Sequence, residues 1–192
     1  MTVRSGLYIL MLAWLSACTD DNDTNTSINT VDTASQKGTK QLYDFAVYKN
    51  DFGMPLKAWA HELQLEANLG KPLSESVIQL GPGADTHMGA YIKQLDYEGL
   101  KILLYAPRTP DSAWIMKMVV TGDAYTTARG MKTGVDTGRI TEYYPEALKW
   151  PDGKRDQSST PYYISNESEQ LYLRLYVSIG KVDSMVMYHD LP

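Results

Sequence analysis

Apolar and polar residues alternate along most of the second half of the chain. Alternation with a period of two places apolar side chains on one face of a β-strand and polar side chains on the other. Glycine-containing pairs such as Glu98-Gly99 and Ile179-Gly180 interrupt the pattern and predict turns. The predicted strands are residues 91–97, 99–106, 114–121, 162–165, 171–178 and 181–189.

The segment before residue 90 predicts one more strand and a helix. Apolar residues occupy the odd positions from Trp59 to Leu69, which favours a strand with His61 on its apolar face. A histidine in that place is more often a core residue than a metal ligand. Pro72 through Leu80 is typical of a short helix that ends at a Gly-Pro-Gly turn. Residues 124–128 are strand-like, and a second short helix is expected from Asp136 or Thr137 to Tyr144.

The two halves of this pattern resemble each other. Residues 99–105 and 170–176 both carry apolar side chains at their second, fourth and sixth positions and both end in tyrosine. Upstream, Gly70 aligns with Gly134 and Leu80 aligns with Tyr144, so the two predicted helices correspond. Any two alternating strands look similar, and chance likeness is the alternative to a duplication.

The predicted fold class is therefore α+β. We expect a tandem repeat of a short helix plus an antiparallel β-meander, with the strands of both repeats in one sheet that has one open face. Repeat 1 covers about residues 61–122 and repeat 2 covers about residues 123–190.

The first residues predict an export signal. Arg4 precedes an apolar run over residues 6–15, which is shorter than the roughly 20 apolar residues of a transmembrane helix. The run ends in Leu15-Ser16-Ala17-Cys18, and this tetrapeptide resembles the lipobox of bacterial lipoproteins. The resemblance implies a signal peptide of residues 1–17, cleaved before Cys18, with a lipidated Cys18 that anchors the protein to a membrane. A secreted protein with a free Cys18 is the alternative.

The residues after the cysteine predict a spacer. Residues 18–40 are mostly Thr, Asp, Asn, Ser, Gly and Lys, a composition that cannot bury a core and favours a flexible tether. The globular domain is then expected over residues 41–192. Thr19, rather than Asp, follows Cys18, and by resemblance to enterobacterial lipoproteins this favours the outer membrane, facing the periplasm, over the inner membrane.

Composition excludes several classes of function. Eighteen Lys and Arg against 23 Asp and Glu give a net charge of −5, which disfavours a nucleic-acid partner. One cysteine and three widely spaced histidines predict no metal site, and no motif indicates a cofactor. The chain also lacks the G-x-S-x-G motif. We therefore expect no enzyme and no catalytic residue.

One motif carries a resemblance to a fold family. Thr127, Arg129-Gly130-Met131 and Gly134, followed by Ile140 and Tyr143-Tyr144, are similar to a pattern found in tandem-repeat proteins with the β-lactamase-inhibitor-protein-like fold. Small outer-membrane assembly lipoproteins use a related unit of a helix followed by a meander. The resemblance implies that fold and a partner-binding open sheet face. Pro145 stands where the pattern usually has glycine.

The tyrosines indicate where a partner binds. The chain has 14 Tyr and only 2 Phe, although Phe fills a core without a hydroxyl to satisfy. In the strand over residues 171–178, Tyr172, Arg174 and Tyr176 share one face, and in the equivalent strand Lys101 and Tyr105 do so. Tyrosine and arginine are enriched at the energetic centres of protein interfaces. The alternative is that tyrosine is simply a good strand former.

These observations predict a lipid-anchored, non-catalytic, protein-binding module of the cell envelope. An inhibitor or immunity protein with an envelope protein as partner is the first hypothesis. An assembly or maintenance factor of the outer membrane is the second, and a small-molecule sensor is the third.

Overall fold

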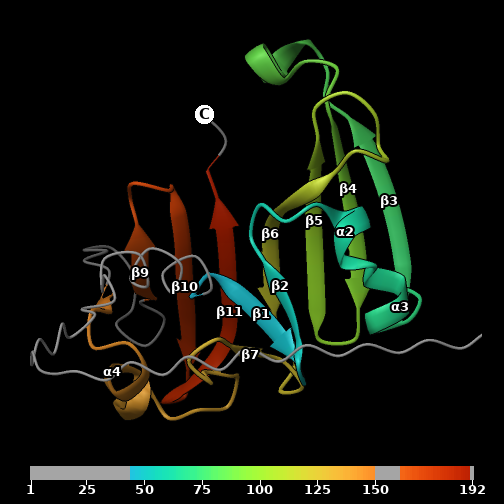
Figure 1. The fold of residues 1–192 in the computed structure, drawn as a ribbon. Helices are drawn as coiled ribbons and strands as arrows, with labels where there is room; N and C mark the ends of the chain where they lie inside the picture. Colours follow the sequence, from blue (N-terminus) through green and yellow to red (C-terminus); the bar gives the residue numbers. More distant parts are fainter. Residues whose placement is uncertain (1–43, 150–160, 191–192) are drawn as a thin grey trace, which may run out of the picture. The chain divides into compact units, whose positions relative to one another are not determined.

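The alternating segments pair into one large antiparallel sheet (Figure 1). Its strand order is β3-β4-β5-β6-β11-β10-β9-β8, so the pairing of β6 with β11 joins two groups of four strands that follow one another along the chain. The strands are β3 (Ser74–Gln79), β4 (Tyr91–Tyr97), β5 (Leu100–Ala106), β6 (Trp114–Val120), β8 (Leu148–Lys149), β9 (Tyr162–Asn166), β10 (Leu171–Ser178) and β11 (Lys181–His189).

The computed structural model describes residues 44–149 and 161–190. The predicted signal peptide (1–17), Cys18 and the tether (18–40) lie outside these residues. Within them, the strands predicted by alternation are confirmed to within about a residue at each end, as β4, β5, β6, β9, β10 and β11. None of the helices in this part of the chain is long and apolar enough to span a membrane.

A second, smaller sheet has the order β2-β1-β7. Its strands are β1 (Ala46–Lys49), β2 (Phe52–Pro55) and β7 (Thr126–Thr127). The strand expected over residues 124–128 is thus only two residues long, and it pairs with β1 rather than with the large sheet. The remaining elements are short helices: α2 (Ala60–Leu63), α3 (Leu65–Leu69), α4 (Ile140–Tyr143) and the 3-10 turns η1 (Pro82–His87) and η2 (Thr137–Arg139).

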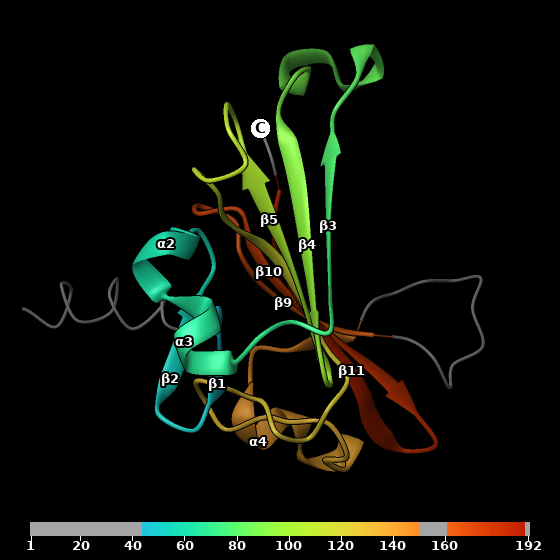
Figure 2. The ribbon, with the colours of Figure 1, turned by 90° about the vertical axis from the view of Figure 1, so that its right-hand side faces the viewer.

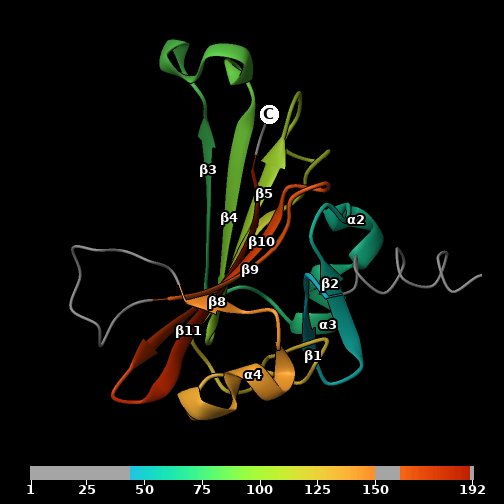
Figure 3. The same ribbon diagram turned by 90° about the vertical axis from the view of Figure 1, so that its left-hand side faces the viewer.

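One face of the large sheet forms the core. Leu173 of β10, Met187 of β11 and Met118 of β6 are fully buried in adjacent strands and pack with residues of the small sheet such as Val47 and Met54. Figures 2 and 3 show α2, α3, β1 and β2 together on this side of the sheet. The opposite side of the sheet, called the open face below, carries the alternate residues of β5, β6, β9, β10 and β11. The fold class is therefore mixed and mostly antiparallel sheet.

The strand predicted over residues 59–69 is wrong. This segment forms α2 and α3, which meet at Gln64 in the left-handed conformation with φ 48°. The apolar residues at odd positions match a strand, but the segment Ala60–Leu69 consists largely of strong helix formers and contains no β-branched residue. His61 consequently lies exposed on α2, beside the ring of Trp59 at 6.1 Å, and not on the apolar face of a strand.

The helix predicted over residues 72–80 is also wrong. Residues 74–79 form β3, which pairs with β4 along its whole length, and Ser74 donates a hydrogen bond of 2.7 Å to the Asp96 carboxylate instead of capping a helix. The β-branched pair Val77-Ile78 suits a strand, and pairing with β4 outweighs the weak helical spacing. The alignment of Gly70 with Gly134 and of Leu80 with Tyr144 fails for the same reason, because it matches a strand to a helix. The helix predicted up to Tyr144 is confirmed as η2 and α4.

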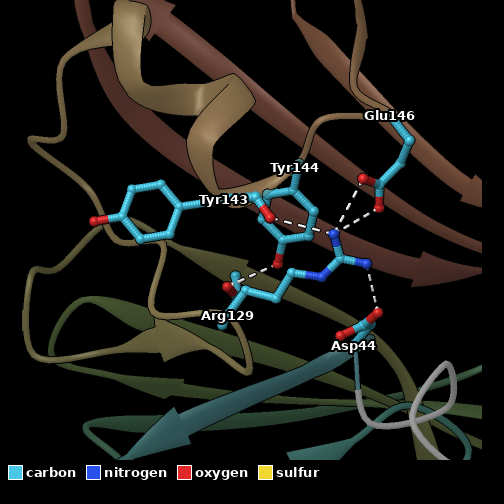
Figure 4. A network of polar contacts seen from close by, with 6 residues as sticks. Asp44, Arg129, Tyr143, Tyr144 and Glu146 are labelled. Atoms are coloured by element: carbon cyan, nitrogen blue, oxygen red, sulfur yellow. Dashed lines mark hydrogen bonds and ion pairs between the residues drawn. The ribbon is translucent and has the colours of Figure 1, made fainter.

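Arg129, from the motif that resembles the inhibitor-protein-like fold, joins α4 to the start of β1 (Figure 4). Its guanidinium donates a 2.6 Å hydrogen bond to the Asp44 carboxylate and pairs with Glu146 at 2.8 Å. The same group donates to the Tyr143 carbonyl and lies 4.7 Å from the centre of the Tyr144 ring. Because Asp44 is almost buried, this charge pair has little competition from water.

Tyr144 and Thr127 complete this network. The Tyr144 hydroxyl donates a 2.7 Å hydrogen bond to Thr127 Oγ1, which also accepts one from the backbone N–H of Met131. Tyr144 is fully buried, and this burial raises its pKa to about 12. The motif residues therefore hold the connection between β7 and α4 in the core.

The first prediction concerns Tyr144→Phe. An unfolded tyrosine releases its proton near pH 10, whereas folded Tyr144 holds it to about pH 12, so rising pH favours unfolding. This group alone removes about 1.4 kcal/mol of the wild-type free energy of unfolding by pH 11. Tyr144→Phe has no phenol to titrate and does not lose this free energy at high pH. At pH 8, however, the missing hydrogen bond lowers its free energy of unfolding by about 1 kcal/mol relative to the wild type. Urea unfolding should show the wild-type advantage at pH 8 disappearing by pH 11, and a constant gap would contradict the prediction.

Candidate functional site

The outward side of β10 carries the three residues predicted as a binding surface. Tyr172, Arg174 and Tyr176 are half-exposed on the open face, and the alternation that predicted this is confirmed. The residues between them face the core: Leu171, Leu173 and Leu175 are buried. The structure therefore brings the predicted Tyr-Arg-Tyr row together in one accessible line.

Two further tyrosines extend this row across the neighbouring strands. Tyr163 of β9 stacks on Tyr172 with ring centres 5.8 Å apart, and Tyr172 stacks on Tyr188 of β11 at 5.1 Å, with 24° between the planes in both pairs. Tyr172 and Tyr188 are direct cross-strand partners in the register of β10 and β11. These three residues, the tyrosine stack, form an aromatic strip across β9, β10 and β11.

Arg174 lies beside the tyrosine stack. Its guanidinium is 4.9 Å from the centre of the Tyr188 ring, a cation–π arrangement. Partial burial acts to lower the pKa of Arg174, but hydrogen bonds with Tyr176 and Tyr188 and the fields of these residues raise it by more. The guanidinium is thus held as a cation between aromatic rings, which fixes a side chain that would otherwise be mobile.

A shallow hollow of about 400 Å³ runs along β11 next to Arg174. Its apolar lining includes Val186. Polar groups come from Arg174, Tyr176 and Tyr188. Lys117 of β6 pairs with Tyr188 across the central strands and also lines the hollow. The candidate surface therefore combines an aromatic strip with an adjacent hollow of cationic and hydroxyl groups.

The two candidate residues on β5 differ from each other. Lys101 is exposed and lies 3.4 Å from the Asp96 carboxylate of β4, so part of its charge is already compensated. Tyr105 is buried, and its hydroxyl is 2.9 Å from Nδ1 of His87. The rings of His87 and Trp114 pack edge-to-face against the Tyr105 ring, with ring centres 5.5 and 5.4 Å from its centre. Tyr105 thus lies under other side chains and offers almost no accessible area.

Sequence reasoning did not find Tyr163, Tyr188 and Lys117 as parts of this surface. Tyr163 and Tyr188 lie on strands that were predicted correctly, but which residues face Tyr172 depends on the register between strands. A sequence shows which residues of one strand share a face, but the partner across the ladder is set by turns and bulges, such as the irregularity between Tyr176 and Val177. The excess of tyrosine over phenylalanine was the only signal for Tyr163 and Tyr188, and the sequence carried none for Lys117.

A larger hollow lies on the core side of the sheet. It measures about 620 Å³ and is bounded by α2, α3, β3 and β4, with Leu65, Leu95 and Tyr97 among its apolar residues. Its polar rim includes Glu75, which forms a 2.8 Å ion pair with Lys93. In residues 44–149 and 161–190, no group of three or more His, Cys, Asp or Glu side chains could hold a metal ion.

Comparisons with known proteins add no assignment. No family model matches the chain, and neither the curated proteins nor the solved structures contain a match.

The second prediction separates the two faces of β10. Leu173→Ala removes a fully buried side chain and should lower the free energy of unfolding by about 2–5 kcal/mol. Tyr176→Ala removes a half-exposed ring and should cost no more than about 1 kcal/mol. Denaturant unfolding of both variants measures this difference. Equal losses would mean that the open face is covered in the folded protein.

Proposed function

We propose that this chain is a lipid-anchored protein of the bacterial cell envelope whose open sheet face binds another protein. The observation that carries the proposal is the tyrosine stack with Arg174 at its side. Stacked rings and a guanidinium held beside them lose little conformational freedom when a partner arrives, so more of the contact energy remains as affinity. The proposed role is non-catalytic, as for an inhibitor or immunity protein.

The anchor rests on the N-terminal sequence. The apolar run and Leu15-Ser16-Ala17-Cys18 support cleavage before Cys18 and lipidation of its thiol. Two or more acyl chains give stable attachment to a bilayer, since each buried CH₂ contributes about 0.8 kcal/mol. The tether then holds the binding face away from the membrane surface, on the periplasmic side of the outer membrane.

A tandem duplication is part of the proposal. In each half, short helices precede four antiparallel strands: α2 and α3 precede β3–β6, and η2 and α4 precede β8–β11. The similar segments at 99–105 and 170–176 lie on β5 and β10, the third strand of each group. The order of elements supports a duplication whose two halves meet at the pairing of β6 with β11.

The third prediction tests lipidation. The mature wild-type protein, expressed in a Gram-negative host, should begin at Cys18 and carry the mass of a diacylglycerol and an N-acyl chain. Cys18→Ser should accumulate uncleaved and without acyl mass. Intact-protein mass spectrometry with membrane fractionation measures both outcomes. An unmodified thiol on a secreted wild-type chain would contradict the anchor and leave the binding face to be tested separately.

The fourth prediction tests the binding face in intact cells. A photo-crosslinking amino acid in place of Tyr176 should give one dominant adduct with an envelope protein, because its side chain lies on the candidate surface. The control position is Ile179, in the turn after the same strand, which is 97% exposed but outside the surface. Tyr172→Ala in the Tyr176 crosslinking background should reduce the adduct severalfold. The same adducts from both positions, or none from Tyr176, would contradict a protein-binding role for this face.

A further inference from the structure

The hollow beside Arg174 has a charge opposite to that of the chain. The chain carries a net charge of −5, whereas the hollow is lined by two cations, Lys117 and Arg174, and one carboxylate, Asp190. Nearby, Lys57 and Glu169 compensate each other in an ion pair of 3.5 Å. The hollow is therefore locally positive by about one charge on an acidic protein, an arrangement that favours an anionic group.

His189 is one of the residues that line the hollow. Its ring packs edge-to-face on Trp114 at 5.4 Å. Nδ1 is buried and makes no hydrogen bond within the described residues. Burial and the charge of Lys57 lower the pKa of His189, so the ring is neutral at pH 7 and one of its two nitrogens carries a proton.

Hydroxyl groups and the aromatic wall complete the lining. Tyr176 and Tyr188 flank Arg174 and hold its planar guanidinium by hydrogen bonds. A fixed guanidinium can donate two parallel hydrogen bonds to two oxygens of a carboxylate, and it can do the same to a phosphate, which is why phosphate is one of the probes below. The tyrosine stack continues from Tyr188 to Tyr172 and Tyr163, which provides an apolar strip next to the charged hollow.

We propose that this hollow receives a carboxylate side chain, an aspartate or glutamate, presented by the protein partner, with Arg174 as its principal ligand and Lys117 as a second cation. This inference rests on the proposed function and names the chemistry of the partner. The tyrosine stack favours a protein over a free acid, because a small acid would leave the aromatic strip uncovered.

The experiment uses the mature lipidated chain in detergent micelles, with a model peptide as probe. Acetyl-Ala-Glu-Ala-amide is titrated while the side-chain Nε–H of Arg174 and the indole N–H of Trp114 are followed by NMR. The matched probe, acetyl-Ala-Gln-Ala-amide, lacks only the charge, and inorganic phosphate is the third probe. We expect saturable shifts with the glutamate peptide, weaker shifts with phosphate and none with the glutamine peptide.

Variants assign the response to the hollow. Arg174→Gln should weaken binding of the glutamate peptide about tenfold or more, followed at the Trp114 indole, because it removes a charge-assisted pair of hydrogen bonds. Arg174→Lys keeps the positive charge but loses the paired N–H groups, so its affinity for the glutamate peptide should lie between those of the wild type and Arg174→Gln. Lys181→Gln, which removes an exposed cation at the other end of β11 that does not line the hollow, is the matched control and should leave binding unchanged. Unchanged backbone spectra establish that each variant is folded.

Three outcomes would overturn the inference: no response of the wild type to the glutamate peptide, an equal response to the glutamine peptide, or a response that Arg174→Gln does not weaken. If a partner is crosslinked at position 176 and any of these results is also found, the proposal of protein binding stands. Only the proposal that the partner inserts a carboxylate is then overturned. A peptide response without any crosslink shows instead that the ligand is a free acid and overturns the assignment to a protein partner.

Discussion

The pairing of β6 with β11 is the constraint on which the rest of the structure depends. It joins two four-stranded groups, and its register places Met118 opposite Met187 and Val120 opposite Met185, all four buried in the core. A shift by one residue would turn Met187 outward and bury Tyr188 without a partner for its hydroxyl. The same register that closes the core therefore places Tyr188 beside Lys117 on the open face.

The tyrosine stack explains why this face is built from tyrosine rather than phenylalanine. The rings pack against one another across β9, β10 and β11, which stabilises the sheet, while the hydroxyls form hydrogen bonds on this face, Tyr188 with Arg174 and Tyr163 with Ser165. Arg174 depends on the same arrangement, because Tyr176 and Tyr188 hold its guanidinium by hydrogen bonds. Stability of the second half of the sheet and readiness for binding thus come from one set of contacts.

The long strands from residue 91 onward could be predicted because apolar and polar residues alternate along them. Prediction from the sequence failed for residues 59–69 and 72–80, where spacing was given more weight than residue type: helix formers make α2 and α3, and Val77-Ile78 lie in β3. The outward orientation of Tyr172, Arg174 and Tyr176 could be predicted from β10 alone. The stacking of Tyr188 on Tyr172 could not, because register depends on contacts between distant segments. Nor could the cover over Tyr105, which comes from His87 and Trp114.

The motif residues Thr127, Arg129 and Tyr144 hold one part of the core together and say nothing about the partner. Thr127, Arg129 and Tyr144 form a network with Asp44 and Glu146 that ties α4 to the start of β1. None of these residues belongs to the tyrosine stack or lines the hollow beside Arg174. A chain could keep this network unchanged while every side chain of the open face was replaced. The identity of a partner must therefore be sought from the chemistry of the open face, and the fold resemblance cannot supply it.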